Sequence, residues 1–199
     1  MKLGLTGGIA SGKSTVSAML VKLGAKLVDA DQVAREVVLP GEPALEQVVA
    51  RFGQAVLNED GTLNRSKLGS LVFTPDKQNL KDLEAILHPA IRARMQERMD
   101  AYLKEDPNLL VIADIPLLYE TNQAGLYDAV MVVYVPPEKQ LQRLMEREGL
   151  TEEESLMRIK LQMDINEKKR LANYVIDNSG SLEDTTRQVG QFWREHEFS

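Results

Sequence analysis

A glycine-rich loop near the N-terminus, GGIASGKST at residues 7–15, is the feature that most constrains how this chain can fold. Gly7, Gly12, Lys13 and Ser14 match the pattern G-x-x-x-x-G-K-[ST], which binds the phosphates of nucleoside triphosphates. An apolar run, residues 2–6, precedes the loop, and apolar residues at helical spacing follow it. The pattern therefore predicts a buried strand, a phosphate loop and a helix in direct succession. A plain glycine-rich turn into a helix is the weaker alternative.

The residue types of the loop suit a polyphosphate, which needs convergent donors without steric bulk. Glycines let the backbone curl until successive N–H groups point inward, and the following helix directs its positive dipole end to the same place. Lys13 can reach the β- and γ-phosphates, and the Ser14 hydroxyl can join the ligands of Mg²⁺. The residues expected to contact the nucleotide are Gly8, Ala10, Ser11, Gly12, Lys13, Ser14 and Thr15.

Short apolar runs alternate with helical patterns along much of the chain, which predicts an α/β fold with a parallel sheet covered by helices on both faces. A helix is expected over residues 14–23, closed by Gly24. The five expected strands are residues 2–6, 26–29, 109–113, 129–135 and 174–176.

Residues 42–106 break this alternation, because they contain no convincing strand and carry helical patterns. Thr74 and Pro75 resemble a helix start, with Thr74 as the cap. His88 precedes Pro89 and is expected to interrupt that helix, because the residue before a proline avoids helical geometry. Beyond it an apolar stripe recurs every four residues, which is more typical of core packing than of a ligand site: Ile91, Met95, Met99 and Leu103. We expect 42–106 to be a helical lobe inserted into the sheet domain.

Residues 137–171 are expected to form a second helical lobe. The sequence TEEE at 151–154 fits a capping box, in which Thr151 and Glu154 each satisfy a free backbone donor. Residues 181–184 open the last helix in a similar way, and its periodicity predicts that Leu182, Val189 and Trp193 are buried. The chain is thus interpreted as one domain, with a core of residues 1–41, 107–136 and 172–199 that carries the two helical segments.

Composition excludes several classes of protein. The net charge of −6 argues against a nucleic-acid binder, which usually has a basic face. The absence of cysteine excludes disulfides and thiolate metal sites, and with two histidines no zinc site is expected. No secretory signal is recognisable, and no apolar stretch reaches the roughly 20 residues that span a bilayer. We expect a cytoplasmic protein that binds neither membranes nor nucleic acids.

The other motifs of the chain and its length indicate which class of phosphate-loop protein it is. A GTPase normally carries N-K-x-D for guanine, and this motif is absent. Residues 177–180, DNSG, match D-x-x-G, but they lie near the C-terminus and are interpreted as a strand ending in a turn. The chain is short for a motor ATPase, so a kinase acting on a small acceptor is the best class.

Asp29 and Asp31 follow the second expected strand, where the strand ends of a parallel sheet face the ligand crevice. They could serve Mg²⁺ or an acceptor hydroxyl. An aspartate-rich helix N-terminus, favoured by the helix dipole, explains them equally well. Asp31 is the better candidate for a catalytic base, because other kinases with this loop carry D-x-D here.

Several segments together resemble the dephospho-CoA kinase family over nearly the whole chain. They are LTGGIASGKSTV at 5–16, LVDADQVAREVV at 27–38, FGQAVLNEDGTLNRSKLGSLVF at 52–73, LHPAI at 87–91, ADIPLLYE at 113–120, QLQRLMER at 140–147 and VIDNSG at 175–180. The resemblance implies the P-loop kinase fold and transfer of the γ-phosphoryl of ATP, with Mg²⁺, to the ribose 3′-hydroxyl of dephospho-CoA. It also implies that 42–106 binds the acceptor and that the protein is a monomer or a weak homo-oligomer.

By this resemblance Asp31 would orient or deprotonate the acceptor hydroxyl, while Lys13 neutralises charge on the moving phosphoryl group. Arg143 and Arg147 are four residues apart, so they share a helix face, and the resemblance assigns them to the lid over ATP. A solvated basic face is their alternative interpretation. Asp114 would help to hold Mg²⁺ through water, or would cap the next turn.

For most of the other positions that match the family, two interpretations stay open. Arg65 contacts the acceptor phosphates or pairs with a carboxylate, and His88 lines the acceptor pocket or only shapes the helix break. Leu117, in the ADIPLLYE segment, is a candidate acceptor contact, and Glu120 ends that segment. Gln162 and Lys168 match lid positions, with exposed helix surface as the alternative.

The chain departs from the family pattern at Ala10, where glycine is usual, and at Asn173, where aspartate is common. A methyl group at a variable position of the loop should be tolerated, and Asn173 loses only a charge. A kinase resembling shikimate kinase, which also has D-x-D after its second strand, is the alternative enzyme. A nucleotide-dependent switch without catalysis is the alternative outside enzymes.

Overall fold

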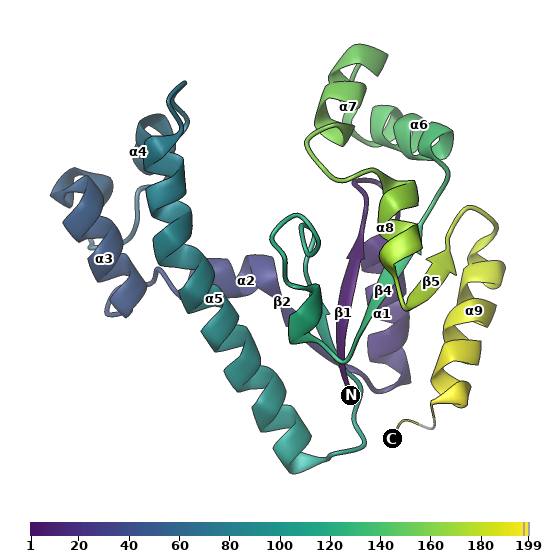
Figure 1. The fold of residues 1–199 in the computed structure, drawn as a ribbon. Helices are drawn as coiled ribbons and strands as arrows, with labels where there is room; N and C mark the ends of the chain where they lie inside the picture. The colour runs from purple at the N-terminus through teal and green to yellow at the C-terminus, as the bar shows by residue number, and fades with distance from the viewer. Residues whose placement is uncertain (197, 199) are drawn as a thin grey trace. The chain divides into compact units, whose positions relative to one another are not determined.

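The computed structural model describes residues 1–196 and 198 of this 199-residue chain (Figure 1). Contacts divide the chain into two compact units: the first is Met1–Val28 with Met99–Ser199, and the second is Asp29–Arg98. The strands are β1 (Lys2–Gly7), β2 (Lys26–Asp29), β3 (Val111–Asp114), β4 (Ala129–Tyr134) and β5 (Tyr174–Asp177). The helices are α1 (Lys13–Leu23), α2 (Ala30–Glu36), α3 (Pro43–Phe52), α4 (Arg65–Val72), α5 (Gln78–Glu105), α6 (Pro137–Glu148), α7 (Glu152–Ile159), α8 (Ile165–Leu171) and α9 (Leu182–Glu195), with short 3₁₀ turns at Gln54–Val56 and Ala124–Leu126.

The five strands form one sheet in the order β2-β3-β1-β4-β5, which confirms the predicted five-stranded sheet. β1 pairs in parallel on both sides, so that Leu3 lies opposite Ile112 of β3 and Ala129 of β4. β5 continues the parallel pairing on the far side of β4. Because β1 is the central strand, the loop that follows it emerges in the middle of the carboxyl edge of the sheet.

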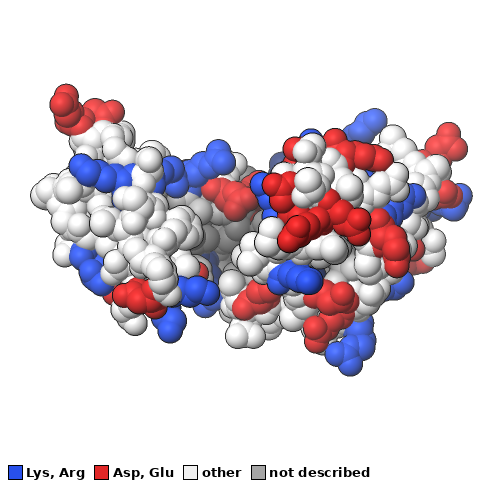
Figure 2. Space-filling model, turned by 90° about the horizontal axis from the view of Figure 1, so that it is seen from above, with Lys and Arg blue, Asp and Glu red and all other residues white. Residues whose placement is uncertain are grey.

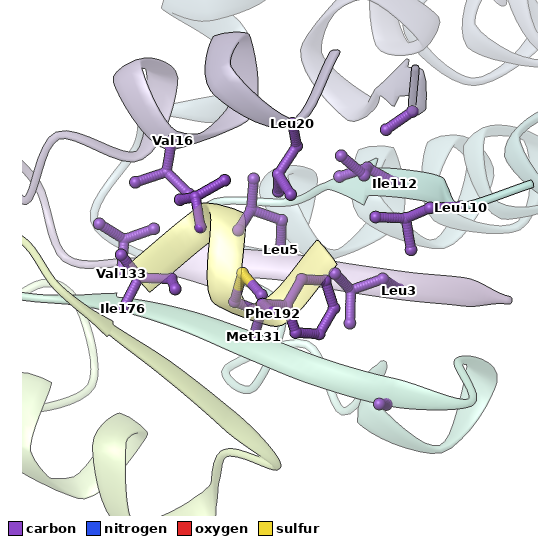
Figure 3. Close-up of a cluster of buried hydrophobic side chains, with 13 residues drawn as sticks. Leu3, Leu5, Val16, Leu20, Leu110, Ile112, Met131, Val133, Ile176 and Phe192 are labelled. Carbon is purple, nitrogen blue, oxygen red and sulfur yellow. The ribbon is translucent and has the colours of Figure 1, made fainter. Parts of the chain in front are cut away.

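The core of the first unit lies between the sheet and the helices α1 and α9. Figure 3 shows Leu3 and Leu5 of β1 pointing into the same cluster as Leu20 of α1 and Phe192 of α9, and each is at most 5% exposed. Burying one side chain of this size contributes about 1.5–3 kcal/mol. The strand before the phosphate loop and the helix after it are therefore both anchored in one rigid core.

The predicted capping boxes are both present. Thr151 Oγ1 accepts from the backbone N–H of Glu154, and the Glu154 carboxylate accepts from the Thr151 N–H at 2.9 Å, which starts α7. Ser181 and Asp184 make the same reciprocal pair at the start of α9.

Figure 2 shows acidic side chains gathered over the α6 and α7 part of the surface, which is unlike the basic face of a nucleic-acid binder.

The buried face of α9 differs from the predicted one at its first turn. Val189 is 1% exposed and Trp193 packs partly buried against the core, as predicted. Leu182, however, is 63% exposed, so its predicted burial is wrong. It is the first residue of the helix, where the side chain projects beyond the core, and Phe192 fills the apolar face instead.

The second unit is helical and has a core of its own. Val48 of α3, Val56, and Leu68 and Val72 of α4 are each at most 5% exposed and form one cluster. Half-buried leucines and an isoleucine from the first half of α5 pack against it. This unit begins at Asp29, earlier than the lobe of 42–106 expected from the sequence, and it ends at Arg98.

The predicted helix start at Thr74 and Pro75 is wrong. α4 ends at Val72, and α5 begins only at Gln78. Asp76 provides the accepting side chain, because its Oδ1 takes the Gln78 N–H at 2.9 Å. Asp76 lies two residues before the Gln78 N–H, and its side chain accepts from this donor in place of the more distant Thr74.

The predicted break at His88 and Pro89 is also wrong, because α5 runs without interruption through both residues (Figure 1). A proline inside a helix costs about 3 kcal/mol through its missing N–H and a clash with the preceding turn. Packing on both sides of Pro89 offsets that cost. Leu87 packs against the core of the second unit, and Met95 and Met99 are at most 1% exposed.

An ion pair joins α2 to α5 within the second unit and makes its stability sensitive to acid. Arg98 donates through both terminal nitrogens to the Glu36 carboxylate, and this hydrogen bonding lowers the pKa of Glu36 below its ordinary value. A lowered folded-state pKa adds stability above the ordinary value of about 4.5, and that stability is lost as pH falls through the folded value. We expect Glu36→Gln to reduce the loss of thermal stability between pH 7 and pH 3. Glu84→Gln, an exposed change on the same long helix, is the control, and equal effects of the two changes would contradict the assignment.

Within the described residues, no helix combines the length and the apolar character that crossing a membrane requires.

Candidate active site

The loop between β1 and α1 adopts the curled backbone that its glycines allow. Gly12 has φ +86° and forms the N-cap of α1, and the Ser11 N–H turns back to the Gly8 carbonyl at 3.1 Å. This conformation brings the first turn of α1, with its unpaired N–H groups, to the end of the loop. The predicted succession of strand, loop and helix is present.

Two of the loop glycines lie against amide side chains that contact the loop. A Cβ on Gly12 would lie 2.1 Å from the Nδ2 atom of Asn178, and one on Gly8 would lie 2.3 Å from the Nε2 atom of Gln140. A larger residue at either position would displace the end of that side chain from its place. Gly12 is favoured by its backbone angle as well, because side chains rarely adopt φ +86°.

Ala10 is the one residue of this loop that takes a left-handed backbone without being glycine, with φ +60°. A non-glycine residue in this region costs roughly 1–2 kcal/mol, partly offset by the greater chain entropy that glycine loses on folding. We expect Ala10→Gly to leave ATP affinity unchanged and to raise the free energy of unfolding by up to about 1 kcal/mol. Denaturant titration and ATP binding measure the two effects. A clear loss of stability would show that the methyl group packs favourably.

Lys13 and Asp114 form an ion pair at the carboxyl end of the sheet. Lys13 Nζ donates to Asp114 Oδ1, and Asp114 is 7% exposed at the end of β3, next to β1. The pair holds the ammonium group beside the loop. Ser14, one residue further, is exposed at the first turn of α1. A hydroxyl and a carboxylate are hard oxygen ligands of the kind that Mg²⁺ takes, together with substrate phosphates.

A cavity of about 400 Å³ opens beside the loop. Arg143 and Arg147, which share a face of α6, line this cavity. Arg143 Nη2 donates to the Asn178 carbonyl at 3.0 Å, and Arg147 Nη2 lies 2.6 Å from Glu148 Oε1. Positive side chains over a phosphate loop suit a polyanion. The residues that line the cavity are Ala10, Gly12, Ser14, Thr15, Arg143, Arg147, Asn178, Gly180 and Leu182.

Asn178 is the most important residue of the site that sequence reasoning missed. It belongs to the segment VIDNSG, for which the sequence predicts the end of a strand and a turn and which also carries the family resemblance, but no role follows from the sequence for Asn178 itself. Its Nδ2 atom donates to the Ser11 carbonyl at 2.8 Å, and its Oδ1 atom accepts from Thr185 Oγ1 at 2.8 Å. Asn178, which lies between β5 and α9, thus links the phosphate loop to Thr185 of α9. Its position directly after an apolar strand was the available signal, because such positions lie at the carboxyl edge of the sheet.

Residues of α6 and of the segment before α8 also contact the phosphate loop. Gln162 Oε1 accepts from the Ile9 N–H at 2.8 Å, and Gln140 Nε2 donates to the Ile9 carbonyl at 2.9 Å. Lys168 is fully buried, so its interpretation as exposed helix surface is wrong. Burial lowers the pKa of Lys168 and the charge of Lys13 acts in the same direction, while the hydrogen bond to Glu120 opposes them.

The candidate acceptor residues lie on separate elements. Asp29, at the end of β2, caps α2: its Oδ1 accepts from the backbone N–H groups of Asp31 at 2.7 Å and Gln32 at 3.0 Å. The helix-terminus interpretation therefore holds for Asp29, whereas the Asp31 side chain remains exposed in the first turn.

Arg65 is the first residue of α4, is exposed, and pairs with no carboxylate within the described part of the chain. His88 is half-buried inside α5. Leu117, which belongs to the first unit and follows β3, is 41% exposed.

Comparison with known proteins gives one consistent family. A family model described as dephospho-CoA kinase matches residues 1–184. The dephospho-CoA kinase of Shouchella clausii (strain KSM-K16) is 51% identical over 189 residues, which cover 95% of each chain. Thermus thermophilus TT1252 matches with a TM-score of 0.78 and 37% identity, over 98% of this chain and 97% of that one. The dephospho-CoA kinase from Campylobacter jejuni matches with a TM-score of 0.75 and 33% identity, over the same shares.

Proposed function

Because this chain belongs to the dephospho-CoA kinase family, we propose that it transfers the γ-phosphoryl group of ATP to the ribose 3′-hydroxyl of dephospho-CoA. The products are ADP and coenzyme A. The observation that carries this proposal is the family match over residues 1–184, which includes both the phosphate loop and the segments around it. The shikimate-kinase-like enzyme and the non-catalytic switch are not favoured.

The geometry of the first unit supports the ATP half of the reaction. The loop, the first turn of α1 and the ammonium group of Lys13 converge beside a cavity that Arg143 and Arg147 line. In the structure Lys13 pairs with Asp114. On binding, Lys13 exchanges this partner for the β- and γ-phosphate oxygens and stabilises the charge that develops there. Arg143 and Arg147 act on the same phosphates from the lid.

The transfer itself needs positioning more than covalent chemistry. The ribose 3′-oxygen attacks the γ-phosphorus, the bond between that phosphorus and the β–γ bridging oxygen breaks, and ADP leaves with the electron pair. Asp31 accepts the proton of the 3′-hydroxyl as the new P–O bond forms. Its exposed carboxylate at the start of α2 is available for this role, because Asp29 and not Asp31 serves as the helix cap.

Mg²⁺ is part of the proposal. The Ser14 hydroxyl would bind it, with Asp114 holding it through water once Lys13 has moved to the phosphates. When bound, the ion neutralises phosphate charge. Mg²⁺ usually keeps several waters and takes one or two protein groups, so no dedicated cage is required. Consistent with this, the described residues include no cluster of three or more histidines, aspartates or glutamates placed to hold a metal.

The acceptor is assigned to the helical segment 42–106, with Arg65 and His88 as contacts, and Leu117 stays a further candidate contact. Residues 137–171 act as a lid that excludes water, which would otherwise hydrolyse ATP. We further propose that the protein works in the cytoplasm. We propose that it is a monomer or a weak homo-oligomer, and light scattering can test this oligomeric state.

One assay tests the proposed function. The protein is supplied with ATP, Mg²⁺ and dephospho-CoA, and coenzyme A and ADP are measured together. Parallel reactions contain shikimate or no acceptor. Equal amounts of coenzyme A and ADP are expected with dephospho-CoA alone. Folded protein that binds ATP but forms no coenzyme A would overturn the assignment, and ADP release without any acceptor would favour a switch.

A further inference from the structure

Lys168 of α8 is a charged group beside the site that the proposed mechanism does not use. Its side chain is 0% exposed, although lysine is among the residue types least often fully buried. The ammonium group donates to the carbonyl oxygens of Gly7 at 3.3 Å and Pro116 at 3.1 Å, and it lies 2.8 Å from Glu120 Oε1. These three partners match the three donors of an ammonium group.

These contacts connect three segments around the phosphate site. Gly7 is the last residue of β1 and the first of the phosphate loop. Pro116 follows β3, which ends with the buried Asp114. Glu120 Oε1 also accepts from the Met163 N–H at 2.9 Å, just before α8 begins. One buried charge therefore holds the start of the loop, the segment after β3 and the start of α8 together.

A contribution to stability does not explain this arrangement well. Removing a lysine and a carboxylate from water costs much of what their attraction returns, and apolar residues of similar volume often stabilise a core as well or better. Glu120 in addition keeps its second oxygen, Oε2, buried without a hydrogen-bond partner among the described residues. An ammonium group can donate hydrogen bonds that hold two carbonyl oxygens at fixed positions, whereas a methyl group cannot.

We propose that Lys168 is a positioning residue for phosphoryl transfer, because its ammonium group fixes the start of the phosphate loop against the segment after β3. This inference rests on the proposed kinase function. It makes α8, the last helix of the lid, part of the frame that sets the loop geometry. Gln140 and Gln162 support the same frame, since they hold both backbone groups of Ile9, one from α6 and the other from the connection between α7 and α8.

Three variants separate positioning from folding. Lys168→Met removes the charge and its hydrogen bonds but leaves Glu120 buried without its partner, which by itself destabilises the protein. Lys168→Met combined with Glu120→Gln removes both charges, and the glutamine oxygen can still accept from the Met163 N–H. Lys169→Met makes the same exchange at the next residue of α8, which is exposed and lies over the Tyr134 ring. For each variant the midpoint of thermal unfolding, the Kd for Mg·ATP without acceptor, and kcat are measured.

We expect the double variant to unfold close to the temperature of the wild type and yet to bind ATP about tenfold more weakly, with kcat reduced by about tenfold to a hundredfold. A loop misplaced by about 1 Å can cost this much. Lys169→Met should match the wild type in all three measurements. If the double variant recovers ATP affinity and kcat together with its stability, Lys168 has only a structural role and the proposal is overturned.

The ATP measurement also separates this proposal from the proposed function. Because the Kd is determined without an acceptor, its result does not depend on which acceptor is used. Wild-type protein that binds ATP but forms no coenzyme A would overturn the acceptor assignment alone, whereas unchanged ATP affinity in both Lys168 variants would overturn the positioning role alone.

Discussion

Lys13→Ala is expected to lower kcat/KM for ATP by about a thousandfold, the range found when a main electrostatic contact of a transition state is removed. In the proposed mechanism Lys13 supplies the main fixed positive charge at the phosphates, and Asp114 holds its ammonium group beside the loop. Both ATP binding and the rate of transfer should suffer, because the same ammonium group attracts the bound triphosphate and stabilises the charge that develops during transfer. Steady-state kinetics and ATP titration measure the two effects.

The same substitution removes the ammonium group that pairs with Asp114, which is 7% exposed. Removing one member of a buried ion pair can cost about 3–5 kcal/mol, so part of the lost activity could come from unfolding. Lys13→Ala combined with Asp114→Asn removes both charges of the pair and separates the two causes. Lys160→Ala, an exposed change at the end of α7, is the control. A loss of less than about tenfold in folded Lys13→Ala protein would show that other groups dominate phosphate binding.

Asp31→Asn is expected to leave ATP affinity unchanged and to lower kcat by roughly a hundredfold or more, the usual contribution of a general base. Asparagine keeps the size of the side chain but cannot accept the proton of the 3′-hydroxyl. The two measurements are an ATP titration without acceptor and the initial rate of coenzyme A formation.

Asp29→Asn is the informative comparison. The Asp29 side chain caps α2, and asparagine caps a helix about as well as aspartate. We therefore expect this change to alter kcat by less than about tenfold. If Asp29→Asn abolished transfer while Asp31→Asn turned over normally, the base would be assigned to the wrong aspartate.

The buried Lys168 and the exposed Asp31 place different demands on these experiments. The Asp31 side chain is exposed and is not the cap of α2, although its charge lies in the first turn of that helix. A loss of rate in Asp31→Asn can therefore be interpreted once the stability of the variant is shown to be unchanged. Lys168 holds backbone groups of several segments, and its role can be judged only when stability is restored in parallel. The same reasoning makes the double variants at Lys13 and Lys168 more informative than the single ones.

Local sequence determined much of the fold correctly. The loop pattern, the apolar runs and the two capping boxes each depend on residues within a few positions of one another, so the strands, α1 and the start of α7 could be predicted. The predictions failed where distant packing outweighed local preference. Pro89 lies inside a continuous helix because side chains before and after it are packed, and Leu182 is exposed because its turn extends past the core.

The sequence by itself determined that the chain has a phosphate loop, with Lys13 and Ser14 in it, and it named the family through motifs that keep their order. Only the tertiary structure decided what holds that loop in place. Asn178, Gln140, Gln162 and Lys168 are all more than 130 residues from the loop atoms they contact. No local pattern marks such residues, because a parallel sheet brings the ends of strands together regardless of their separation along the chain. The physical reason is that each of them satisfies a backbone group of the loop, and which side chain can do so depends on the packing of α6, α8 and α9 around the sheet.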